Sequence, residues 1–99
     1  MLQTIEKLAD MISDEICDMT KYAECAHHLK EKYPDVAEVL YTIGTQEERH
    51  MEMLQDVMDR IISNKGTVTP EVQALFSYVK KCNAKEYRKA KEKQKEYSN

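Results

Sequence analysis

The sequence predicts an all-α protein, and two observations carry that prediction. Apolar residues recur every three or four positions over three long segments, which is the period of an amphipathic helix. Glycine and proline number two each and charged residues make up 33% of the chain, a composition typical of long helices. The length of 99 residues predicts one domain covering residues 1–99.

Two long helices are expected in the first two thirds of the chain. The first covers about residues 2–32 and stops at Tyr33-Pro34, because the residue before a proline is disfavoured in the helical conformation. The second covers about residues 35–64, since Pro34 suits a first helical turn. The apolar stripes run through Ile5, Leu8, Ile12, Met19, Ala26 and Leu29, and through Val36, Leu40, Ile43, Met51, Leu54, Met58 and Ile61.

A third helix is expected over about residues 70–95. Thr69 suits its N-cap and Pro70 its first position. Beyond Cys82 the apolar pattern nearly vanishes, and residues 80–99 hold eight basic against three acidic groups, a balance of +5. This basic C-terminal tail is predicted to be a solvated helix that frays, with Tyr87 as its only large apolar contact.

Three polar residues interrupt the apolar stripes of the first two helices. At about 100° per residue, Glu15 falls among Leu8, Tyr22 and Ala26 on the first helix. Glu47 lies at the centre of the second stripe, and His50 lies about 60° to one side of it. The stripes contain no Lys or Arg to pair with these groups.

A metal ion is the best explanation for such carboxylates, because burying them unpaired is costly. Sites for two irons or manganeses in helical bundles use single Glu residues and Glu-x-x-His steps. One chain supplies Glu15 and the step Glu47–His50, which is half of such a site. A two-fold dimer would supply the other half, because it places the same surface opposite itself. Zinc accepts the same ligands.

Two further groups near these residues have weaker patterns. Glu24 and His27 also form a Glu-x-x-His step, but Glu24 lies about 180° from Glu15 and is expected to face solvent. Asp18 lies about 60° from the Glu15 direction. Asp18 is closer to Pro34 in the sequence than Glu15 is, and its separation from Pro34 is closer to that of Glu47. In a simple hairpin, Asp18 would therefore be more nearly level with Glu47. It is therefore a candidate additional ligand, an entry-path carboxylate or a flank residue.

The chain resembles the ferritin-like superfamily, in particular its short half-bundle members related to rubrerythrins and encapsulated ferritins. The likeness covers about residues 8–62 and rests on DEICDMTKYAECA (14–26), on the Tyr-Pro-Asp turn (33–35) and on QEERHMEML (46–54). It implies an antiparallel helical hairpin that completes a four-helix bundle by homodimerisation. The implied metal ligands are Glu15, Glu47 and His50, with the phenol of Tyr22 beside them.

The resemblance also implies a function. Two irons per dimer would support ferroxidase or rubrerythrin-like oxidoreductase chemistry with dioxygen or peroxide. Two alternatives remain open on the sequence: a non-catalytic helical dimer that acts as an interaction or structural module, and a zinc-binding helical protein without redox activity.

Other classes of function fit the sequence poorly. The three cysteines, Cys17, Cys25 and Cys82, form neither a disulfide framework nor a zinc ribbon, so a reduced, cytoplasmic compartment is expected. No apolar run approaches membrane-spanning length. Nucleic-acid binding is disfavoured, because residues 1–79 hold seven basic against fifteen acidic groups, a balance of −8.

Overall fold

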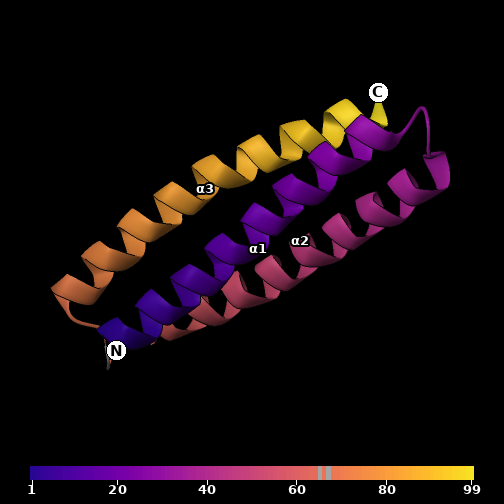
Figure 1. Ribbon diagram of the computed structural model, residues 1–99. Helices are drawn as coiled ribbons and strands as arrows, with labels where there is room; N and C mark the ends of the chain where they lie inside the picture. The colour runs from indigo at the N-terminus through magenta and orange to yellow at the C-terminus, as the bar shows by residue number, and fades with distance from the viewer. Residues whose placement is uncertain (65, 67) are drawn as a thin grey trace.

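The protein is built of three long helices in the computed structural model, which describes every residue except 65 and 67. They are α1 (Leu2–Leu29), α2 (Pro34–Ser63) and α3 (Pro70–Ser98) (Figure 1). No strand occurs among the described residues, so the predicted all-α class is confirmed. The predicted helix ends are within three residues of those observed.

Local sequence explains where the helices begin and end. The side chain of Thr69 caps α3 by accepting a hydrogen bond of 3.2 Å from the backbone N–H of Val72, and Pro70 follows as expected. α1 ends at Leu29, three residues earlier than predicted, and residues 30–33 form the turn into α2. Pro34 occupies the first turn of α2.

α1 is the central helix of a rod measuring 54 × 18 × 18 Å. α2 packs antiparallel along one side of α1, and α3 returns along another side in the same direction as α1 (Figure 1). α2 and α3 make little direct backbone contact. Most of the apolar packing therefore forms between α1 and its two neighbours.

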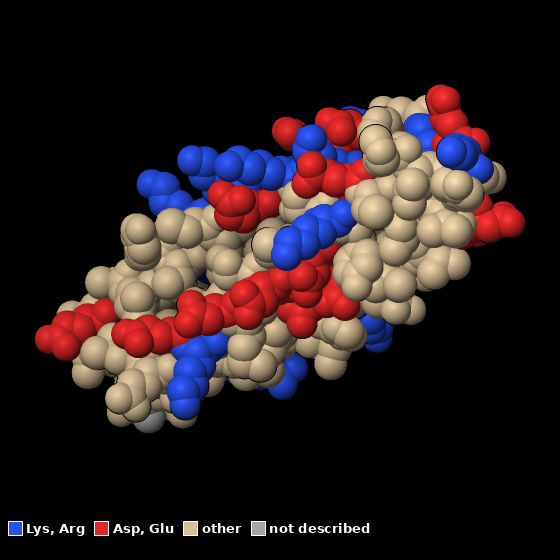
Figure 2. Space-filling model, in the orientation of Figure 1, with Lys and Arg blue, Asp and Glu red and all other residues tan. Residues whose placement is uncertain are grey.

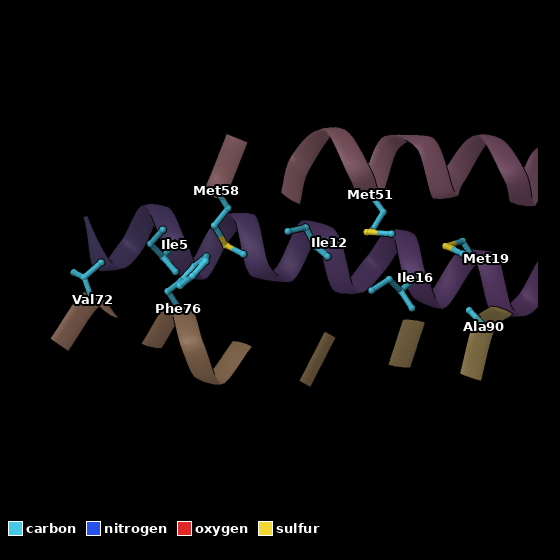
Figure 3. Packing of buried hydrophobic residues seen from close by; sticks show 9 residues of the cluster. All are labelled: Ile5, Ile12, Ile16, Met19, Met51, Met58, Val72, Phe76 and Ala90. Carbon is cyan, nitrogen blue, oxygen red and sulfur yellow. The ribbon is translucent and has the colours of Figure 1, made fainter. Parts of the chain in front are cut away.

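The core is a row of aliphatic and thioether side chains along α1. Figure 3 shows the α1 residues between methionines of α2 on one side and α3 residues on the other. Methionine adapts to irregular gaps, which suits a core with one Phe and no Trp. The buried cluster comprises Ile5, Ile12, Ile16, Met19, Met51, Met58, Val72, Phe76 and Ala90.

The prediction that the basic tail frays into solvent is wrong. α3 continues to Ser98 and stays packed against the bundle, with Ala90 and Gln94 buried. The ring of Tyr97 stacks on that of Tyr41 at 4.7 Å, and Lys30 donates a hydrogen bond to the Tyr97 carbonyl. Small and aromatic residues at helical spacing thus replace the aliphatic stripe that the sequence lacks there.

Polar bridges join α3 to α2 where apolar packing is missing. The Tyr87 hydroxyl donates a hydrogen bond of 2.5 Å to Glu48, and the Lys91 ammonium lies 3.1 Å from the same carboxylate. Lys80 pairs with Asp59 at 3.3 Å. Figure 2 shows basic side chains along α3 at the upper edge and acidic ones along the middle of the same face. The basic segment thus pairs with acidic residues of its own chain.

Candidate metal centre

Glu15 of α1 meets Glu47 and His50 of α2 midway along the helical hairpin. Each residue offers one ligand atom, and these atoms lie within 4.8 Å of one another. Nδ1 of His50 is 3.7 Å from Oε2 of Glu15 and 3.9 Å from Oε2 of Glu47. We call this group the carboxylate–histidine cluster. The structure therefore brings together all three residues that the sequence proposed as ligands.

The turn between the helices explains why Glu15, rather than Asp18, is level with Glu47. Glu15 lies 14 residues before the last residue of α1 (29 − 15), and Glu47 lies 13 after the first residue of α2 (47 − 34). Counting from Pro34 alone placed the reversal too late, because residues 30–32 already belong to the turn. The expectation that Asp18 is level with Glu47 was therefore wrong.

The cluster lies at the edge of the core and opens to solvent on one side. The side chains of Glu15 and Glu47 are 24% and 20% exposed, whereas that of His50 is 55% exposed. Oε2 of Glu15 is buried without a hydrogen-bond partner. A buried carboxylate oxygen without a donor, beside a second carboxylate and an imidazole, fits a divalent metal ion.

The carboxyl group of Glu47 perturbs that of Glu15. A hydrogen bond to Glu47, which the protonated form can make, together with burial and repulsion by Glu47, raises the pKa of Glu15 from 4.5 to about 7. His50 opposes this rise, and the negative charge of Asp18 adds to it. Below neutral pH, Glu15 therefore stays largely protonated unless a cation neutralises the site.

The other candidates are placed differently. Asp18 is half-buried near Glu15 but outside the cluster, so its role as a ligand stays a prediction. Glu24 and His27 are exposed on α1, in agreement with the expected solvent-facing step. Tyr22 is half-buried two helical turns beyond Glu15 on α1, where it packs against α2.

Gly44 is a feature of the site that the sequence interpretation overlooked. A Cβ at this position would lie 3.2 Å from Cβ of Tyr22 and 3.8 Å from the carbonyl oxygen of Met19. The absent side chain lets α1 and α2 approach closely, one turn before Glu47 on α2. The available signal was an isolated glycine inside a helical pattern, which often marks close packing.

Replacing Gly44 by leucine is expected to force α1 and α2 apart beside the cluster. We expect a loss of about 1–3 kcal/mol in the free energy of unfolding, because overpacking outweighs the gain in helix propensity. Urea unfolding followed by circular dichroism measures this loss. Gly66→Leu is the control, since a Cβ there meets only Asn64 Oδ1 at 3.8 Å. Equal effects of both substitutions would contradict close packing at Gly44.

Several exposed apolar residues lie on one side of the same hairpin. Met11 is 50% exposed, and Val36, Val39 and Val57 of α2 are 49%, 59% and 42% exposed. On the helical wheel these side chains lie on the side that carries His50, away from α3. We call this surface the hairpin face. Large apolar side chains exposed on one side of a helix pair fit a surface that another molecule covers.

Comparison with known proteins agrees with this geometry. A family model described as Rubrerythrin matches residues 6–99. The chain belongs to the rubrerythrin family. This match includes α3, which the resemblance placed outside the shared region. No curated protein and no solved structure gives a significant match.

The family membership supports the general character of the cluster. Rubrerythrin-like domains generally bind iron and are typically oligomeric. None of the described helices is both long and apolar enough to cross a membrane. The ferritin-like fold expected from the sequence is therefore supported by the family match as well as by the helical hairpin.

Proposed function

We propose that this chain is a di-iron or di-manganese carboxylate protein whose metal site forms between two copies in a homodimer. The observation that carries the proposal is the carboxylate–histidine cluster. No Lys or Arg among the described residues makes an ion pair with Glu15 or Glu47. A metal ion would supply the positive charge that the protein does not.

The number of ligands and the exposed apolar surface support the proposed dimer. Three side chains from one copy leave a pair of metal ions short of ligands, and a two-fold axis beside the cluster would supply the same three again. The hairpin face would then be covered, and the exposed imidazole of His50 would be enclosed. Completion of a four-helix bundle by two hairpins is the arrangement that this surface supports.

The chain's own residues would divide the work as follows. Glu15 and Glu47 would hold the metals through their carboxylates, and His50 would bind at a terminal position. The phenol of Tyr22 would lie beside the ligands. Two irons bound there would supply oxidation–reduction chemistry with dioxygen or peroxide, as in a ferroxidase or a rubrerythrin-like oxidoreductase. We also place the protein in the reduced cytoplasm, since its cysteines are free and exposed.

Metal content and oligomeric mass, measured together on protein expressed in iron-rich medium, test the proposal. We expect two irons per dimer and dioxygen-dependent oxidation of added Fe(II). A metal-free dimer that cannot be loaded would indicate an interaction module instead. Stoichiometric zinc that persists in iron-rich medium without redox activity would indicate the non-redox alternative.

Charges placed on the hairpin face are expected to dissociate the dimer and to release the metal. Val39→Glu combined with Val57→Glu should give a folded monomer, because both side chains are already exposed in the single chain. Light scattering after size exclusion measures the mass, and elemental analysis measures the iron. Tyr78→Glu is the control, since Tyr78 is 67% exposed on α3. A double variant that remains a dimer would exclude this surface as the interface.

A further inference from the structure

A cavity of about 200 Å³ lies where the three helices meet, on the side where α2 faces α3. Figure 3 shows three of its wall residues, Ile12, Ile16 and Met51, gathered at one level of the bundle. The rest of the wall comes from Gln55 of α2 and from α3, which contributes Lys80, Asn83, Ala84 and Tyr87. The carboxylate–histidine cluster contributes no residue to this cavity.

The cavity exists because α2 and α3 are held apart rather than packed together. The pair Lys80–Asp59 bridges the two helices at one end of the cavity, and Glu48 with Tyr87 and Lys91 bridges them at the other. Both bridges are made by long side chains, which span the gap between α2 and α3. Between them, Ala84 is too small to fill the gap, so an apolar space remains.

One polar group in the wall is unpaired. Nδ2 of Asn83 is buried and has no hydrogen-bond partner, whereas the amide of Gln55 already donates to Asp59 at 2.9 Å. A buried amide donor without a partner destabilises the fold, and an acceptor atom placed beside it would remove that cost. The cavity thus combines apolar walls with one unsatisfied donor.

We propose that this cavity binds a small, uncharged aromatic molecule that carries one carbonyl group. An apolar cavity of about 150 Å³ takes up benzene, so this partly open space of about 200 Å³ suits one substituted ring. The ring would lie against Ile12, Ile16 and Met51, and its carbonyl oxygen would accept the hydrogen bond from Asn83. This site is separate from the proposed metal centre and does not depend on it.

The probes are acetophenone and cumene, which is similar in size but carries a methyl group in place of the carbonyl oxygen and so has no acceptor. Each is titrated into the full-length protein, both as purified and after metal removal, with the methyl groups of Ile, Met and Ala labelled for NMR. We expect saturable shifts at Ile12, Ile16 and Met51 with acetophenone. Asn83→Leu should weaken acetophenone about tenfold relative to cumene, the usual effect of one hydrogen bond.

Ala84→Phe serves as the blocking variant. It is expected to abolish the shifts while leaving the helical circular dichroism unchanged, because residue 84 is exposed at the mouth of the cavity. The absence of saturable shifts in the parent protein would overturn the proposal. So would a ratio of acetophenone to cumene affinity that Asn83→Leu leaves unchanged, since the amide would then have no part in recognition.

Discussion

Glu47→Ala combined with His50→Ala is expected to remove the bound metal from the protein, whereas Glu24→Ala combined with His27→Ala is expected to leave the metal in place. Both changes delete a Glu-x-x-His step, so they match in chemistry. They differ in position, because Glu47 borders the core on α2 while Glu24 is exposed on α1. Metal content per chain, measured by elemental analysis after purification without chelator, distinguishes them.

The fold of the two variants needs a separate measurement. We expect the Glu47→Ala/His50→Ala protein to keep its helical circular dichroism, because it loses one carboxylate from a pair that repels when both groups are ionised. Metal retained at full stoichiometry in this variant would refute the assignment of the cluster as the metal site. Metal lost equally from both variants would show that position on the helix does not matter.

Metal-free protein is expected to lose stability as the pH rises from about 4.5 to about 7, and Glu15→Gln is expected to remove this loss. The folded state raises the pKa of Glu15 from 4.5 to about 7, so folding favours the protonated carboxyl group. That contribution is complete below the unfolded pKa and disappears as the pH passes through the folded pKa. Solvent on the His50 side screens the charge, so we expect a difference of about 1–2 kcal/mol.

Urea unfolding of the metal-free proteins at pH 4, 6 and 8 measures this difference. Other groups titrate in both proteins, so the quantity of interest is the wild-type stability minus that of Glu15→Gln. Glu24→Gln makes the same change at an exposed site of the same helix and should track the wild type at every pH. A Glu15→Gln protein that also tracks the wild type would mean that Glu15 is ionised in the fold without penalty.

The sequence predicted the helical hairpin and the members of the cluster because both depend on helical periodicity. Glu15 and Glu47 are recognised as candidate ligands because the helical wheel places them among apolar neighbours. The same helical wheel places Glu24 on the solvent-facing side of its helix. The ends of the helices were less predictable. A proline marks where α2 begins, but nothing in residues 30–32 marks where α1 stops, and the error of three residues shifted the expected register toward Asp18.

The packing of α3 could not be predicted because the contacts that hold it are not aliphatic. Its last turns are anchored by buried Ala90, by Tyr97 stacked on Tyr41 and by Lys91 beside Glu48. A charged segment with this composition is typical of a solvated helix face, so periodicity alone favours solvent. The partners lie more than forty residues away in the sequence, where local patterns give no indication of them.

Glu47 and Glu48 are adjacent in the sequence, yet their carboxylates contact residues on different sides of α2. Successive helical residues point about 100° apart, so Glu47 reaches the cluster shared with α1 while Glu48 reaches Tyr87 and Lys91 of α3. The two side chains project from the same helical turn. Contacts that hold Glu48 against α3 therefore also restrict rotation of α2 about its own axis, and help to set the direction in which the Glu47 side chain points. α3 does this although it contributes no residue to the cluster.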